Sequence, residues 1–138
     1  MYWGKKIELQ ELAVNQQVAL SSDLSRKIFD ALDNFHDSVL DFASLDKYFL
    51  MVQISSPYSY ILRKYVETIV YFRLQLIENV PEELLPRSDV IIAGISISED
   101  NSPKFTLSLD DGSDLEFLVN LAQCSLIIQV PLTDFGIM

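Results

Sequence analysis

The sequence predicts an α+β domain in which two main helices pack on one face of an antiparallel β-meander of about four strands. Three observations predict this fold class. Apolar residues recur at helical spacing after Ser21, they do so again after Pro57, and the last third of the chain alternates apolar and polar residues between turn sequences. Because the helices come first and the strands afterwards, we expect the helices to cover one face of a single sheet.

Size and composition predict one domain spanning 1–138, because no linker or internal repeat divides the chain. Apolar residues make up 49% of the sequence, which is enough to build a core. The single cysteine, Cys124, excludes an internal disulfide and fits a reducing compartment. The first residues lack the order of a signal peptide, and no apolar run approaches the ~20 residues that span a bilayer. We therefore expect a cytoplasmic protein.

The first helix is predicted over residues 21–42, and the stretches 6–9 and 16–20 could each form a short strand before it. Ser21 or Ser22 can accept a hydrogen bond from a free amide at the helix start, and Asp23 suits the positive end of the helix dipole. The apolar residues that follow fall on one arc of the helix: Leu24, Ile28, Ala31, Leu32, Phe35, Val39 and Phe42.

The second helix is predicted to begin at Pro57 and to end before Pro81, with 48–54 as a short strand ahead of it. Its apolar residues step by three or four positions: Ile61, Tyr65, Ile69, Phe72 and Leu76. The second half of this stretch also alternates as a strand would, so periodicity alone leaves helix and strand open. Its length and the proline at its start favour the helix.

Four strands are predicted in the last third of the chain, at 90–97, 105–109, 115–121 and 125–130. Asn101-Ser102-Pro103 separates the first two strands. Asp110-Asp111-Gly112-Ser113 separates the next two, because Asp and Gly tolerate the conformations of a tight reversal. The sequence therefore predicts that consecutive strands pair as a meander.

Twenty acidic and ten basic residues give a net charge of −10. This charge repels nucleic acid and anionic lipid and favours a cationic partner, so we expect no direct nucleic-acid binding and no membrane binding. Residues 88–138 hold one base, Lys104, and eight acids, an excess that we interpret as solvation: Asp89, Glu99, Asp100, Asp110, Asp111, Asp114, Glu116 and Asp134.

The sequence shows no catalytic or metal-binding constellation. The single histidine, His36, has no serine or cysteine near it in a triad-like signature, and Cys124 has no partner at metal-ligand spacing. The acids around Gly112 do not match the spacing of a calcium-binding loop, which places oxygen ligands at alternate positions before its glycine. We expect no catalytic residue, no metal and no cofactor, and hence not an enzyme.

Four aspartates on the first predicted helix are the strongest candidates for binding a partner: Asp30, Asp33, Asp37 and Asp41. On a helix they would share an arc of about 80°, opposite the apolar residues. Like charges at this spacing destabilise a helix by a few tenths of a kcal/mol per pair, so solubility alone explains them poorly. A ladder of carboxylates that docks on Arg and Lys is one interpretation, and a solvated acidic face is the other.

Further candidates for partner binding come from the predicted hairpin tip and from a cluster of tyrosines: Tyr48, Tyr58, Tyr60, Tyr65 and Tyr71. Tyrosines are enriched at protein interfaces because each offers a large apolar body with one polar end. The candidates are Tyr58 and Tyr60, together with Asp110, Asp111, Asp114 and Glu116.

In size, acidity and predicted layout, the whole chain resembles small bacterial immunity proteins. These proteins neutralise a cognate toxin, often a basic nuclease, by covering its active site. The resemblance implies a protein inhibitor with a basic toxin as its partner, bound through the aspartates of the first helix. A secretion-type chaperone that binds an effector segment is the alternative, and it would predict an apolar groove and a dimer. A small enzyme or ligand-binding domain would instead predict a deep pocket.

Overall fold

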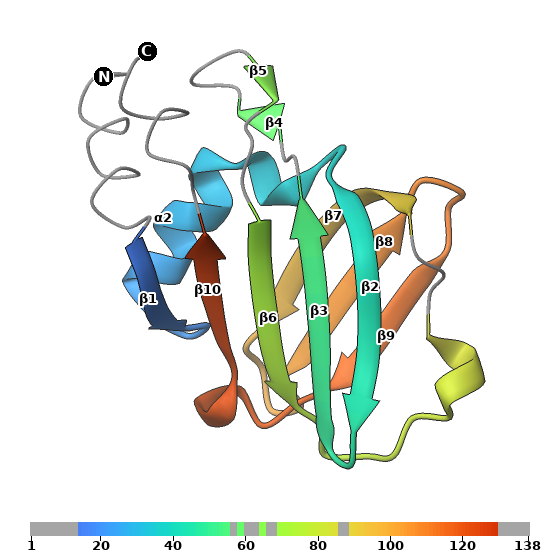
Figure 1. Cartoon of the computed structure of the whole chain (residues 1–138). Helices are drawn as coiled ribbons and strands as arrows, with labels where there is room; N and C mark the ends of the chain where they lie inside the picture. The colour runs from blue at the N-terminus through green and yellow to red at the C-terminus, as the bar shows by residue number, and fades with distance from the viewer. Residues whose placement is uncertain (1–13, 56–57, 60–63, 66–68, 86–88, 130–138) are drawn as a thin grey trace.

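A computed structural model describes residues 14–55, 58–59, 64–65, 69–85 and 89–129. In these ranges the chain forms a curved sheet of eight antiparallel strands, one α-helix beside it and a separate two-stranded ribbon (Figure 1). The predicted α+β fold, with two main helices on a four-stranded meander, is therefore wrong. Within the described ranges, no helix is long and apolar enough to cross a membrane.

The eight strands of the large sheet are, in spatial order, β1 (Val14–Ala19), β10 (Ser125–Gln129), β6 (Ile69–Gln75), β3 (Phe49–Ser55), β2 (Val39–Asp46), β7 (Val90–Ser98), β8 (Lys104–Leu109) and β9 (Asp114–Leu118). The ribbon pairs β4 (Tyr58–Ser59) with β5 (Lys64–Tyr65). The helical elements are the α-helix α2 (Asp23–Ala31) and the 3-10 turns η1 (Asp33–Phe35), η2 (Glu82–Leu84) and η3 (Leu121–Gln123).

The large sheet folds into two layers. Strand β2 pairs with β3 along its length but with β7 only at Val39 and Leu40, so the sheet turns a corner there. Strands β1, β10, β6, β3 and β2 make the front layer, and β7, β8 and β9 lie behind it (Figure 1). At the far end the layers meet again, because Leu76 bridges Val119 and the amide of Ile77 donates to the carbonyl of Leu118 at 3.0 Å.

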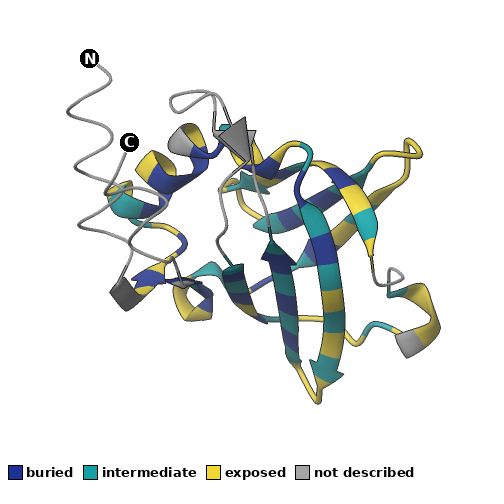
Figure 2. Cartoon of the chain, turned by 45° about the horizontal axis from the view of Figure 1, so that its top comes forward, coloured by how far each residue is buried: buried dark blue, intermediate teal, exposed yellow. Residues whose placement is uncertain are grey.

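One hydrophobic core lies between the two layers, and alternate residues of each strand point into it. Figure 2 shows this alternation as buried bands between mostly intermediate ones along β3 and β6. Phe72 of β6 is fully buried and touches three other rings, with centroids 6.1 Å from Phe29 of α2, 5.4 Å from Phe35 of η1 and 5.3 Å from Phe105 of β8. The same aromatic cluster therefore joins the helix to both layers.

The first predicted helix begins where expected but ends early. The Oγ of Ser22 caps it by accepting a hydrogen bond from the amide of Ser25 at 3.2 Å. The helix then stops at Ala31, because the next turn adopts left-handed φ angles of 52° at Asp33, 53° at Asn34 and 64° at Phe35. Asp and Asn tolerate this conformation better than most residues, so this pair breaks the helix.

Residues 39–42, predicted as the end of that helix, belong instead to strand β2. Leu40, which lay off the apolar arc of the predicted helix, is fully buried, whereas Phe42, which lay on it, is 38% exposed. Pairing with β3 supplies the backbone hydrogen bonds that a helix would have made internally.

The second predicted helix is also wrong in the part that the structure describes. Residues 69–75 form β6, in which Val70, Phe72 and Leu74 are buried and alternate with more exposed residues. The sequence of this stretch also alternates as a strand would, and pairing with both β3 and β10 stabilises the strand over the helix. Residues 56–57, 60–63 and 66–68 lie outside the described ranges.

The predicted strands of the last third are present, but their pairing differs in one respect. β7, β8 and β9 pair in chain order as a meander. β10 leaves the meander and lies between β6 and β1 on the front layer. The short strands suggested at 16–20 and 48–54 correspond to β1 and β3, whereas the stretch 6–9 lies outside the described residues.

Candidate functional site

The four aspartates predicted to share one helix face are distributed over four different parts of the fold. Asp30 is exposed near the end of α2, Asp33 begins η1, Asp37 lies in the turn before β2 and Asp41 lies in β2. The expected ladder on a single helix is therefore wrong.

Asp41 supports the sheet through its side chain. Its carboxylate accepts hydrogen bonds from the Nε2 of Gln53 and the Oγ of Ser55, both at 2.9 Å and both from the neighbouring strand β3. The pairing register shifts between Leu40 and Phe42, so Asp41 lies at an irregularity of β2. The carboxylate of Asp41 therefore stabilises the pairing of β2 with β3 at a bulge.

Asp37 instead lies at the corner where β2 pairs with β7, and two acids that are distant in sequence lie around the same corner. The amide of Asp37 donates to the carbonyl of Ile92 at 2.8 Å. The amide of Asp89 donates to Leu40 at 2.7 Å, and that of Asp110 donates to Ile91 at 3.0 Å. These backbone bonds hold three aspartates around the corner between β2, β7 and β8. We call the group formed by Asp37, Asp89, Asp110 and Asp111 the acid end.

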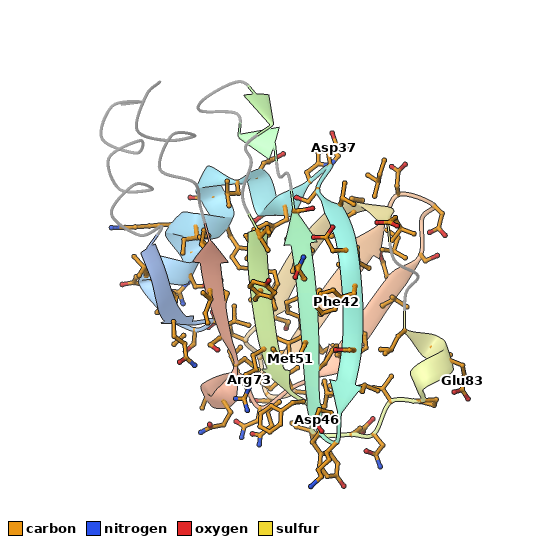
Figure 3. All side chains as sticks on the ribbon, in the orientation of Figure 1. Asp37, Phe42, Asp46, Met51, Arg73 and Glu83 are labelled. Carbon is orange, nitrogen blue, oxygen red and sulfur yellow. The ribbon has the colours of Figure 1, made fainter. Side chains whose placement is uncertain are left out.

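An exposed apolar residue lies within the acid end. Ile91 is 47% exposed, although large aliphatic side chains usually bury more of their surface. With Val90 and Leu109 it lines a shallow hollow of about 300 Å³ whose remaining walls are Asp110 and Asp111. The arrangement is an apolar centre beside a charged rim. Figure 3 labels Asp37, whose side chain points away from the sheet at this edge.

The hairpin tip after β8 is shaped by Asp111. Its carboxylate accepts hydrogen bonds from the Oγ of Ser113 at 2.6 Å and from the amide of Ser113 at 2.8 Å. The hydroxyl and then the amide of Ser113 lower the pKa of Asp111, so this carboxylate remains charged at neutral pH. Gly112 has a φ of 93°, a conformation that favours glycine, and it closes the turn as the sequence predicted.

The other two candidate acids of the hairpin lie on β9, away from the hollow. Asp114 is exposed and pairs through its backbone with Ser108. The Oε1 of Glu116 lies 3.7 Å from the Nζ of Lys104, which compensates part of its charge. The structure therefore separates the four candidate acids of the hairpin, of which Asp110 and Asp111 belong to the acid end and Asp114 and Glu116 do not.

The tyrosine candidates fall largely outside what the structure describes. Tyr58 has a described backbone in β4 but no described side chain, and Tyr60 lies outside the described ranges. Of the other tyrosines in the predicted cluster, Tyr48 is 52% exposed between β2 and β3, and Tyr71 is half-buried on β6. These placements do not test the tyrosine prediction.

The single histidine lies beside an aspartate on the surface, and the single cysteine is buried and hydrogen-bonded. The Nδ1 of His36 lies 3.5 Å from a carboxylate oxygen of Asp37 on the surface. Cys124 is 2% exposed, its Sγ donates to the carbonyl of Asn120 at 3.2 Å, and burial raises the pKa of its thiol. Within the described residues, no three His, Cys, Asp or Glu side chains gather as metal ligands would.

Sequence reasoning missed two surfaces and one acid of the site. Asp89 was counted only as part of a diffuse excess, although its φ of 63° marks a special backbone position. The outer face of the front layer, with Phe42, Met51 and Arg73, was hidden by the prediction of two helices (Figure 3). The second surface is a groove between α2 and β7. Only correct strand assignments could have revealed these surfaces.

Comparisons with protein-family models, with curated proteins and with solved structures find no significant match.

Proposed function

We propose that the chain is a protein inhibitor of the immunity type, which acts in the cytoplasm and neutralises a basic toxin through the acid end. The observation that carries the proposal is the exposed Ile91 in a hollow walled by Asp110 and Asp111, with Asp37 and Asp89 at the same corner of the sheet, on a chain whose net charge is −10. Protein interfaces commonly combine an apolar centre with a polar rim. An acidic rim on an acidic protein speeds association with a basic partner and disfavours partners of like charge.

The spread of the aspartates favours a protein over a single ion. The four residues come from the turn before β2, from the turn before β7 and from the β8–β9 hairpin. Arg and Lys side chains of a partner surface can each reach one carboxylate separately. Arg in particular makes paired hydrogen bonds to a carboxylate, and a nuclease carries such residues to hold phosphate.

The test is capture of partners by the purified chain from the organism that encodes it, at low and at high salt. The acid-end variant carries Asp37→Asn, Asp89→Asn, Asp110→Asn and Asp111→Asn, which keep the side-chain shape and remove four charges. Asn also tolerates the left-handed φ of Asp37 and Asp89, so the backbone should not change. We expect the wild type to capture a basic protein that is toxic when expressed alone and harmless when co-expressed with the chain.

The matched control removes four exposed charges far from the acid end, through Asp46→Asn, Glu78→Gln, Glu83→Gln and Asp100→Asn. Each variant has a net charge of −10 + 4 = −6. We expect the control to retain the partner and the acid-end variant to lose it, with high salt weakening capture by the wild type. A partner that binds both variants equally, or an acidic partner, would contradict the proposal.

A secretion-type chaperone remains the second candidate, favoured by the outer face of the front layer. There Phe42 is 38% exposed, and the guanidinium carbon of Arg73 lies 3.8 Å from the ring centroid of Phe49. The outer face of β7, β8 and β9 differs, since it carries mostly small and polar side chains such as Ser96, Thr106 and Ser108. Light scattering separates the candidates, because the chaperone predicts a dimer that dissociates when Phe42 becomes Ser.

A further inference from the structure

A groove of about 430 Å³ separates α2 from β7, on the side of the molecule where the helix covers the sheet. Its apolar surface comes from Leu20, Phe29, Ile95 and Ile97, and its polar rim from Arg26, Asp30, Asn34, Ser96 and Glu99. Pockets of this size, apolar inside with a few polar groups, are typical of sites for small organic ligands. We call it the α2 groove.

One buried polar group in the wall of the α2 groove has no partner in the fold. Ser25 lines the groove and has no exposed surface, yet its Oγ makes no hydrogen bond with any residue that the structure describes. A buried hydroxyl without a hydrogen bond is costly and uncommon in native proteins, so it calls for an explanation. The amide of Ser25 is already satisfied by Ser22, which leaves only the hydroxyl free for a ligand.

The charges of the α2 groove favour a ligand rich in hydrogen-bond donors. Its one guanidinium, that of Arg26, is shared between Asp23 on its own helix and Glu99, whose Oε2 lies 3.2 Å from the Nη2. Asp30 has no hydrogen bond or ion pair with any described residue. Of the groups that remain, the carboxylate of Asp30 only accepts, whereas the hydroxyls of Ser25 and Ser96 and the side-chain amide of Asn34 can each accept as well as donate.

We propose that the α2 groove binds an organic cation, an ammonium or guanidinium group carried on an apolar chain. The apolar chain lies on Phe29 and Ile97, and the cation donates to Asp30 and to the Oγ of Ser25. An ammonium has three donors and no acceptor, which matches a site with free acceptors. Such a group can belong to a free amine or to a Lys or Arg side chain of a protein. The inference does not rest on the acid end.

The test is a titration of the full chain followed through the backbone amide signals of Ser25, Asn34 and Ile97. The probes share one chain length and differ in the end group: hexylammonium, hexan-1-ol and hexanoate. We expect saturable shifts with hexylammonium, weaker ones with the alcohol and none with hexanoate. A capped Ala-Lys-Ala peptide distinguishes the sources, since tighter binding of the peptide indicates a protein side chain and tighter binding of hexylammonium indicates a free amine.

Two variants test the roles of the named groups. Asp30→Asn should weaken hexylammonium binding roughly threefold, as for an exposed charge pair, and leave the alcohol unaffected. Ser25→Ala should weaken it about tenfold, as for a lost hydrogen bond to a charged group, while the midpoint of unfolding stays equal or rises. Glu83→Gln is the control for loss of one exposed acid. Binding of hexanoate in preference, no binding of any probe, or a Ser25→Ala variant that binds normally would each overturn the proposal.

Discussion

Ser38 offers the clearest test of how buried polar groups affect this fold. It has no exposed surface and its Oγ makes no hydrogen bond among the described residues. Removing the hydroxyl should therefore relieve a desolvation cost. We expect Ser38→Ala to raise the free energy of unfolding by about 1 kcal/mol, measured by urea denaturation. Ser125→Ala is the matched control, because the Ser125 hydroxyl accepts from the Nε2 of Gln17 at 3.2 Å and its loss should lower stability by a similar amount.

Cys124 gives a second prediction at the scale of one residue. Burial raises the pKa of its thiol above the unfolded value, so the neutral thiol is the form that the folded state favours. The stability that this provides is full below the unfolded pKa of ~8.5 and is lost as the pH rises through the folded value. We expect iodoacetamide to modify the folded chain far more slowly than the urea-unfolded chain at pH 8. Equal rates would show that Cys124 is accessible.

The η1 turn is the element that most distinguishes this fold from the predicted one. Three successive residues other than glycine have positive φ angles there, an arrangement that costs roughly 1–2 kcal/mol per residue. Asn34→Gly should therefore leave the free energy of unfolding unchanged or raise it, and Asn34→Val should lower it by about 1–2 kcal/mol. Ser44→Val is the control, since it places the same side chain at an exposed strand position. An Asn34→Val variant as stable as the wild type would exclude a left-handed turn.

The aspartates of the first predicted helix, which we interpreted as a binding surface, also indicate that this helix is short. A row of aspartates weakens a helix, and the structure shows that the helix does not continue through it: α2 stops at Ala31, before Asp33 and Asp37. The helix start at Ser22 was predictable because capping is a local interaction. The strand at 69–75 was not, since its stability comes from β3 and β10, which are distant in sequence.

At the scale of the whole molecule, the acid end could not be predicted from local sequence patterns. Asp37, Asp89 and Asp110 lie around one corner of the sheet because β2 pairs with β7 there and β7 pairs with β8. Sequence patterns predicted the acidic character and the hairpin tip at Asp110 and Asp111 correctly as local features. They did not predict which acids lie together, because that depends on strand order.

The junction of the two layers supplies the last prediction, which concerns Phe72. Its ring contacts Phe29, Phe35 and Phe105, so one side chain links α2, η1 and β8 to the front layer. We expect Phe72→Ala to lower the free energy of unfolding by about 3–5 kcal/mol, the cost of a large cavity in a core. Urea denaturation followed by circular dichroism and by fluorescence checks whether helix and sheet are lost together.

Phe42→Ala is the matched control, because the same ring is removed from a strand position that is 38% exposed. We expect it to cost less than about 1 kcal/mol, since little buried surface is lost. If the layers shared no core, Phe72→Ala would be no more damaging than Phe42→Ala. If α2 were only loosely attached, the helical circular dichroism signal would disappear at a lower urea concentration than the signal of the sheet. A single transition with a large loss would mean that α2, which forms one wall of the α2 groove, and the corner that forms the acid end belong to one cooperative unit.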